Sequence, residues 1–291
     1  MATDDLRPAP VLCADDYGMT AGVSAGIEEL VWAGRLSAVS ALVTRPHWPE
    51  LAPRLEGLRS RAAIGLHLNL TLGEPLGPMP HLAPSGGFPS VGELLKLSTT
   101  GRIDESEIMS EIGRQLDRFE QSMGHAPDMI DGHQHVHAFP QIRRALLRTL
   151  SKRYSTTKPL LRDPADWPTA IVLRGTAVPK ALMIAAVATG FGRSARRLGF
   201  PTNRGFSGVS RFDERIPYAR ELQRFFVQPG RDHLIMCHPG YPDEELARVD
   251  PVVNRRRAEL DVLRSHPELP SLIRHLYRDE AGRIRWGAAD A

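Results

Sequence analysis

Val11-Leu12-Cys13-Ala14-Asp15-Asp16-Tyr17-Gly18 joins a short apolar run to two adjacent carboxylates, and a helical pattern follows it. Two neighbouring acids at the end of a buried strand repel each other, and a bound cation is the simplest way to keep both ionised. The alternative is that one Asp caps the helix while its neighbour is solvated, because Asp is a common N-cap residue. The stretch alone leaves both interpretations open.

The composition is that of a globular protein with a substantial core. The chain has 291 residues, of which 42% are hydrophobic and 24% charged, and a formal net charge of +3. These are ordinary values, and so small a charge does not indicate a nucleic-acid partner. The run Arg255-Arg256-Arg257 is interpreted as a solvated helix face. The two cysteines, Cys13 and Cys237, are too few for a disulfide scaffold and are expected to be buried thiols.

A cytoplasmic protein without an integral membrane segment is expected. Residues 1–10 lack the apolar core of a secretion signal. The longest apolar stretch, residues 177–191, is interrupted by Pro179 and Lys180 and is too short to span a bilayer.

Apolar, β-favouring runs alternate with helical patterns along most of the chain. Strands are predicted at residues 11–14, 37–44, 62–72, 129–131, 160–162 and 233–238. Helices are predicted at residues 21–33, 47–58, 105–123, 140–152, 178–197, 216–227, 251–265 and 269–277. This alternation favours a parallel sheet, and the length favours a closed or nearly closed (β/α) barrel. We expect one domain over residues 1–291, with a helical insertion around 165–200 and a Gly- and Pro-rich excursion at 73–92.

The polar residues share a position relative to the predicted strands. In (β/α) barrels the chemistry gathers at the carboxyl ends of the strands. The candidates predicted at or near such ends are Asp15, Asp16, His67, His133, His135 and His238. His67 is flanked by Leu66 and Leu68, so it faces the opposite side of its strand, the barrel lumen; a core histidine is the alternative. His238 precedes Pro239-Gly240 and could instead cap a turn.

The segment Asp131-Gly132-His133-Gln134-His135-Val136-His137 places three imidazoles at alternate positions. Alternate residues of an extended segment share a face, so the three could approach one cation or be divided between ligands and their supports. A polar surface loop is the alternative.

One carboxylate with two imidazoles suits a divalent cation such as Zn²⁺ or another first-row metal. With open positions, such an ion polarises a carbonyl and lowers the pKa of bound water. A second carboxylate can then act as general base and a histidine as general acid, which are the parts needed to hydrolyse an amide or ester.

Five motifs occur in order over residues 10–240, and together they resemble the YdjC-like carbohydrate deacetylases, the group that includes chitooligosaccharide deacetylase. They are Ala14-Asp15-Asp16-Tyr17-Gly18, Gly65-Leu66-His67-Leu68, residues 131–137, Gly205-Phe206-Ser207 and Met236-Cys237-His238-Pro239. The resemblance implies a distorted or incomplete (β/α) barrel of the TIM type. It also implies metal-dependent removal of acetate from an N-acetylated amino sugar or oligosaccharide.

The resemblance implies roles for individual residues by their positions in these motifs. The metal ligands would be Asp16, His67 and His133; Asp15 would be the general base and His238 the general acid. Substrate-binding or supporting roles are implied for Asp131, His135, Arg162, Phe206 and Ser207. One divalent ion, Mg²⁺ or Zn²⁺, a small-molecule N-acetylated sugar as partner and a homodimer are implied as well.

The apolar segment at residues 178–197 departs from the pattern of the chitooligosaccharide deacetylases. It is interpreted as a hydrophobic lid or dimer surface, or as a membrane contact that admits a lipid-linked amino sugar. Two other functions stay open: a metal-dependent phosphoesterase on a similar barrel, and a non-catalytic carbohydrate- or metal-binding protein.

Overall fold

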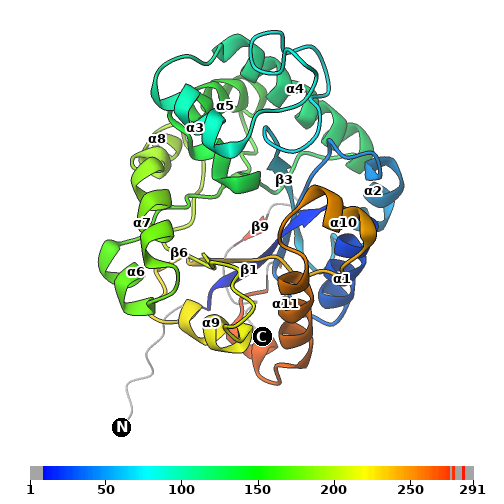
Figure 1. The fold of residues 1–291 in the computed structure, drawn as a ribbon, viewed down its shortest axis with the longest axis vertical. Helices are drawn as coiled ribbons and strands as arrows, with labels where there is room; N and C mark the ends of the chain where they lie inside the picture. The colour runs from blue at the N-terminus through cyan, green and yellow to red at the C-terminus, as the bar shows by residue number, and fades with distance from the viewer. Residues whose placement is uncertain (1–8, 276, 279–283, 286–291) are drawn as a thin grey trace.

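A curled sheet of seven parallel strands lies at the centre of the protein (Figure 1). The computed structural model describes residues 9–275, 277–278 and 284–285. The strands are β1 (Val11–Tyr17), β2 (Ala38–Ala41), β3 (Ala63–Leu68), β4 (Met129–Gly132), β5 (Leu160–Leu161), β6 (Phe206–Ser207) and β7 (Leu234–Cys237). Their order is β5-β4-β3-β2-β1-β7-β6, a half-barrel. The predicted incomplete (β/α) barrel is confirmed. An isolated parallel bridge pairs Leu161 of β5 with Thr202, which precedes β6 in the chain.

Helices surround the sheet and connect its strands. They are α1 (Ala21–Trp32), α2 (Trp48–Glu56), α3 (Val91–Thr99), α4 (Glu105–Met123), α5 (Pro140–Arg153), α6 (Pro168–Arg174), α7 (Val178–Val187), α8 (Phe191–Arg197), α9 (Tyr218–Phe225), α10 (Glu244–Val249), α11 (Asn254–Ser265) and α12 (Leu269–Leu272). A 3₁₀ segment, η1, covers His133–Ala138, and a small hairpin pairs β8 (Tyr277–Arg278) with β9 (Ile284–Arg285). The sequence did not predict α3 or α10. The helix predicted at 269–277 is wrong beyond Leu272, because Ile273 is extended.

The predicted helical insertion covers the inner face of the half-barrel. It forms three helices, and the predicted continuous helix at 178–197 is broken at Gly190, which has a left-handed φ of 84°. Ala181 and Ile184 of α7 pack in a cluster with inner-face residues such as Cys13 and Met236. The outer face of the sheet packs in a second cluster with the surrounding helices. The insertion thus fills space that further strands would fill in a closed barrel.

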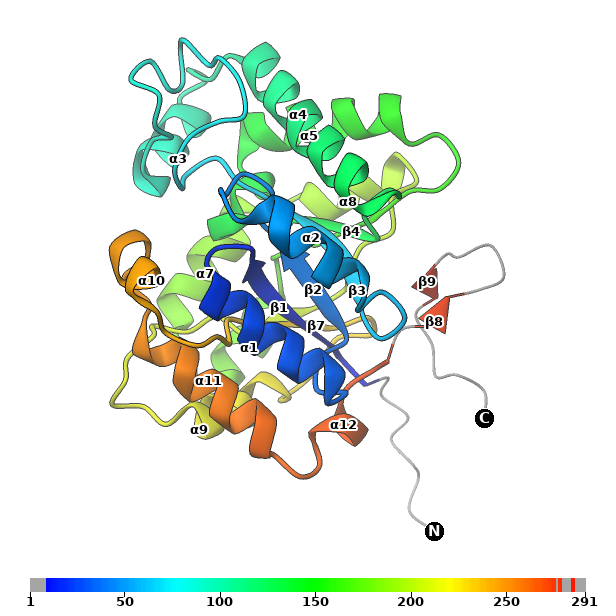
Figure 2. The ribbon, with the colours of Figure 1, turned by 90° about the vertical axis from the view of Figure 1, so that its right-hand side faces the viewer.

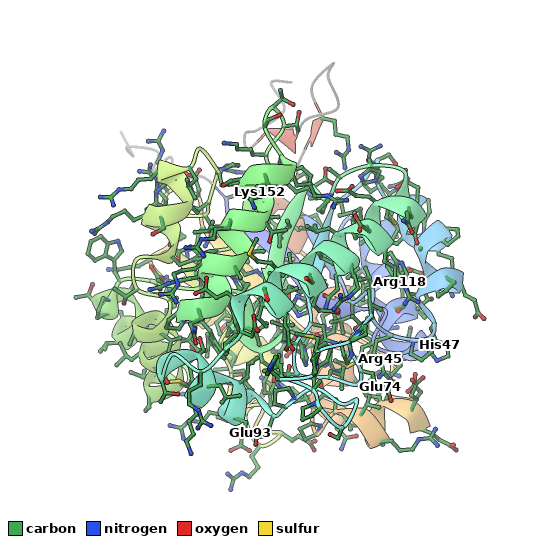
Figure 3. The ribbon with its side chains drawn as sticks, turned by 90° about the horizontal axis from the view of Figure 1, so that it is seen from above. Arg45, His47, Glu74, Glu93, Arg118 and Lys152 are labelled. Atoms are coloured by element: carbon green, nitrogen blue, oxygen red, sulfur yellow. The ribbon has the colours of Figure 1, made fainter. Side chains whose placement is uncertain are left out.

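The carboxyl ends of the strands face the side of the molecule on which α3, α7 and α10 lie, and the β8–β9 hairpin lies at the opposite end (Figure 2). Helix α10 is fastened there through Glu245, which binds Arg45 at 3.0 Å and His47 at 2.8 Å; both partners are labelled in Figure 3. The described residues hold no helix with the length and apolar character needed to cross a membrane. Most of residues 1–10, where no secretion signal is expected, lies outside the described part of the chain.

Candidate active site

Asp15 and Asp16 lie near the carboxyl end of β1, at an irregularity of the strand. The pairing of β1 with β2 shifts register between Ala14 and Tyr17, and Asp16 has a left-handed φ of 69°. In a regular strand, neighbouring side chains point to opposite faces. The bulge redirects one of them. Both carboxylates therefore line the same cavity.

Gly18 completes this turn of the chain. Its φ is +88°, and a Cβ atom at this position would lie 2.8 Å from the backbone oxygen of Leu42. Only glycine meets both conditions without strain. The Gly in the A-D-D-Y-G motif is thus required by the backbone that presents the two aspartates.

Asp16, His67 and His133 converge on one point. Oδ1 of Asp16 lies 2.9 Å from Nδ1 of His133 and 3.3 Å from Nε2 of His67. All three donor atoms lie within 4.8 Å of one another. His67 is on β3, one residue before its end, and His133 directly follows β4. The predicted placement of these side chains at strand ends is confirmed.

His67 is oriented by a second layer of polar groups. Its Nδ1 atom lies 2.7 Å from Oδ1 of Asp131 and 3.2 Å from the hydroxyl of Ser40, which also donates to Asp131. Burial alone would lower the pKa of His67, but the Asp131 carboxylate raises it to about 10. A carboxylate on the far nitrogen of an imidazole is the usual support of a metal-binding histidine. Ser40 was not predicted; its only signal was a polar residue in the run 37–44.

Arg162 joins Asp15 to Asp131. Both oxygens of Asp15 accept from the guanidinium at 2.6 Å, and Nη2 lies 2.5 Å from Oδ2 of Asp131. The same nitrogen lies 3.1 Å from the sulfur of Cys13. Arg162 is completely buried and does not line the cavity, so substrate contact, one of the two roles expected of it, does not fit its position. Arg162 contacts the Asp15 carboxylate without reaching the cavity.

Arg256 contacts Asp16 from the other side. Its Nη2 atom lies 2.7 Å from Oδ2 of Asp16 and 2.9 Å from Oδ2 of Asp250. Burial opposes ionisation of Asp16, but Arg256 and then His133 hold the pKa of its carboxyl well below the usual range. The prediction that residues 255–257 form a solvated face is wrong for Arg255 and Arg256, which are 2% and 1% exposed. The run of three arginines did not reveal this, because most of the partners, Asp16, Glu221 and Asp250, lie outside the helix and are brought close only by the fold.

His238 follows β7 and lines the same cavity. Its backbone N–H donates to Glu259 at 2.6 Å, and its ring meets the ring of Phe212 edge-on at 5.2 Å. Removal from bulk water lowers the pKa of the imidazole to about 4.

The three histidines of residues 133–137 do not share a face, because the segment is not extended. Of the two arrangements expected for them, the approach of all three to one cation does not fit, whereas a division between proposed ligands and supporting residues does. The segment is a 3₁₀ turn in which Gln134 and His135 have left-handed φ values of 53° and 62°. His133 contacts Asp16, whereas Nε2 of His137 donates to the backbone oxygen of Arg162 at 2.8 Å. His135 lines the cavity and packs edge-on against Phe206.

Phe206 and Ser207 of β6 are buried and do not line the cavity. The Ser207 hydroxyl donates to the backbone of Phe225 at 3.0 Å and lies 2.9 Å from Nε2 of His233. Direct substrate binding by these two residues, one of the roles expected of them, does not fit this position. Phe206 packs against His135, which fits a supporting role for this phenylalanine.

The donor set of Asp16, His67 and His133 suits one divalent cation. The guanidinium groups of Arg162 and Arg256 contact four carboxylates, those of Asp15, Asp16, Asp131 and Asp250. Two negative charges remain among these groups, which one divalent ion would balance. One carboxylate oxygen and two imidazole nitrogens are typical ligands of Zn²⁺ and related ions, with positions left open.

Two other clusters of potential ligands do not fit a metal. Cys13, Asp15 and Asp131 lie close together, but the Arg162 guanidinium already contacts all three. A second cluster around Glu107 is at the surface, where its carboxylate accepts from the backbone of residues 81 and 82. Within the described residues, the Asp16 site is the cluster whose three members all line the cavity.

The fold and the site together define the class: a parallel (β/α) half-barrel with polar side chains gathered at the carboxyl ends of its strands, where such barrels place their functional residues. A family model of "YdjC-like protein" matches residues 11–275, and the chain belongs to this family. It is 30% identical over 270 residues to a chitooligosaccharide deacetylase of Serratia marcescens, covering 90% of this chain and 93% of the relative. It is 28% identical over 256 residues to one of Klebsiella pneumoniae, covering 88% and 90%.

A solved structure from Enterococcus faecalis V583 shares the fold. It is named as a cellobiose-phosphate cleavage protein and has a TM-score of 0.68 and 22% identity to this chain. The match covers 91% of this chain and 94% of that one. The incomplete barrel is therefore the fold of a wider group of proteins.

Proposed function

We propose that this protein is a metal-dependent carbohydrate N-deacetylase that hydrolyses the acetamide of an N-acetylated amino sugar. The observation that carries the proposal is the convergence of Asp16, His67 and His133 beside Asp15, whose carboxylate Arg162 holds through both oxygens. The relatives named as chitooligosaccharide deacetylases support the reaction and the class of substrate.

Asp16, His67 and His133 would hold the metal. A divalent ion bound there supplies a Lewis acid for a carbonyl oxygen and lowers the pKa of coordinated water. The two imidazoles favour Zn²⁺ or another first-row metal over Mg²⁺, which prefers oxygen ligands.

Asp15 accepts the proton of the water that attacks the acetyl carbon. Arg162 fixes the plane of its carboxylate and compensates its charge. His238 donates a proton to the nitrogen as the carbon–nitrogen bond breaks, so that acetate and a free amine leave. Burial lowers the pKa of His238 to about 4, so its imidazole is neutral near pH 7 and takes up a proton during turnover before it donates one to the nitrogen.

The phosphoesterase alternative is less well supported. Such enzymes commonly use two metal ions about 3.5–4 Å apart. Among the described residues, the cluster next to the Asp16 site already surrounds the guanidinium of Arg162. The non-catalytic alternative is less well supported, because Asp15 and His238, the proposed base and acid, both line the cavity beside the Asp16 site.

Acetate release from a panel of N-acetylated sugars, with the metal-free protein reloaded with Zn²⁺, Mg²⁺, Mn²⁺ or Co²⁺, tests the proposal. We expect release that depends on the metal and is lost in Asp15→Asn. Phosphate release from sugar phosphates in the same preparations, without acetate release, would favour the phosphoesterase instead.

A further inference from the structure

The cavity has two chemically different parts. Its volume is about 480 Å³, within the range of roughly 300–1,000 Å³ typical of small-molecule sites. The charged residues described above line one part. The other part is lined by aliphatic side chains of α3, α7 and the segment after α10, among them Val91, Leu95, Met183, Val187 and Val252.

The aliphatic side chains of α3, α7 and the segment after α10, here called the aliphatic wall, are poorly suited to bind a chain of sugars. Each pyranose ring of an oligosaccharide presents several hydroxyl groups, and burying them without hydrogen-bond partners is costly. No Trp or Tyr is among the described residues that line the cavity. Phe139 is only 5% exposed, and Lys180 Nζ covers the ring of Phe212 at 4.7 Å. Phe139 is thus buried, and Lys180 already occupies one face of Phe212.

The same wall fits a hydrocarbon chain. Met183 lines the cavity and is 50% exposed, so the apolar surface of α7 continues from the cavity to the outside of the protein. The inner residues of this helix are fixed, because Ala181 and Ile184 pack on the inner face of the half-barrel. Val91 and Leu95 of α3 are only partly buried. The exposed apolar groups of two helices thus border one cavity.

We propose that the substrate is an amphiphilic N-acetylated amino sugar, with one sugar unit at the polar end and a hydrocarbon aglycone against α3 and α7. This inference rests on the proposed deacetylase function and names its substrate class. Each methylene buried against the wall should raise affinity roughly fourfold. An alkyl chain contacts the wall equally in the ground and transition states, so it should act mainly on KM.

Three N-acetylglucosamine probes test the inference: the octyl glycoside below its critical micelle concentration, the methyl glycoside and the β1,4-linked disaccharide. We expect kcat/KM for acetate release to be more than tenfold higher for the octyl glycoside than for either other probe. Isothermal titration calorimetry of the same glycosides gives a readout that does not need turnover, and the octyl glycoside should bind more than tenfold more tightly than the methyl glycoside.

Val187→Gln places a polar group in the wall and should reduce the octyl-to-methyl ratio at least fivefold in both measurements. Ala186→Gln is the matched control, because Ala186 is exposed on the same helix and does not line the cavity. Equal values for the octyl and methyl glycosides, or a preference for the disaccharide, would overturn the inference and leave the deacetylase proposal standing. Tighter binding of the octyl glycoside without acetate release from any probe would instead refute the deacetylase proposal.

Discussion

The Nη2 atom of Arg256 lies 2.7 Å from Oδ2 of Asp16, while Nδ1 of His133 contacts the other oxygen of that carboxylate at 2.9 Å. The guanidinium therefore occupies one oxygen and leaves the second directed toward the two imidazoles. Asp250 binds the same nitrogen of Arg256 and balances its charge. Helix α11, near the end of the chain, thus orients the carboxylate of Asp16, near the beginning of the chain.

Replacing Arg256 should weaken metal binding, because Asp16 then loses the contact that fixes its rotation. For Arg256→Gln we expect an affinity for Zn²⁺ about 10–100-fold lower, the usual effect of removing a group that orients a ligand. Calorimetric titration of the metal-free protein measures this directly, and Arg256→Lys should recover part of the loss. An unchanged affinity in Arg256→Gln would mean that Asp16 is held by the bulge of β1 alone.

Replacing Asp15 should separate metal binding from turnover. In Asp15→Asn the three proposed ligands stay in place, so we expect stoichiometric metal and a loss of most acetate release, since the amide cannot accept a proton. Metal analysis beside the acetate assay is the measurement. Full activity in this variant would contradict the role of Asp15 as base.

The histidines of residues 133–137 should differ in their effect on the metal. His133→Ala removes a proposed ligand and should abolish stoichiometric binding. His137→Gln is the comparison, since Nε2 of His137 contacts the backbone oxygen of Arg162 instead, and it should retain the ion. Elemental analysis of both purified proteins distinguishes them. Metal loss in His137→Gln alone would reverse the assignment.

Removal of Arg162 should destabilise the fold strongly. Arg162→Met leaves the buried carboxylates of Asp15 and Asp131 without their shared cation, a loss of about 3–5 kcal/mol. Urea denaturation of the metal-free proteins gives the difference. Arg144→Met is the control, because its ion pair with Glu105 lies at the surface and should contribute less than about 1 kcal/mol. Similar midpoints for the two variants would refute the buried network as a source of stability.

Glu259 should make stability depend on pH. Burial raises the pKa of its carboxyl from 4.5 to about 7. The folded state therefore binds this proton more tightly than the unfolded state does. Its contribution is complete below about pH 4.5 and is lost as the pH rises through about 7. Glu259→Gln should consequently be less sensitive to pH in this window, with a relative gain of up to roughly 3 kcal/mol at pH 8. Denaturation curves at pH 5 and pH 8 test this; a parallel pH dependence in both proteins would contradict it.

The class of fold and most of the proposed site could be predicted from the sequence, because the signals are local. The alternation of apolar runs with helical periodicity is written in consecutive residues, and the carboxyl ends of parallel strands meet at one edge of a sheet. This is why Asp15, Asp16, His67, His133 and His238 could be placed together in advance. The family motifs then added expected roles that composition and spacing do not contain.

Only the tertiary structure decided how distant segments contact each other and where the backbone departs from regular geometry. The left-handed residues at 134 and 135 separate histidines that alternation would put on one face. In the sequence Arg256 is one of three consecutive arginines expected at the surface; in the fold, α11 packs against α1 and α9, and Arg256 is buried beside Asp16. The sequence determined which donors reach the strand ends, since strand periodicity is local. The packing of helices far along the chain decided how each donor is oriented. A buried charge needs a partner of opposite charge, and that partner can come from any segment that the fold brings close.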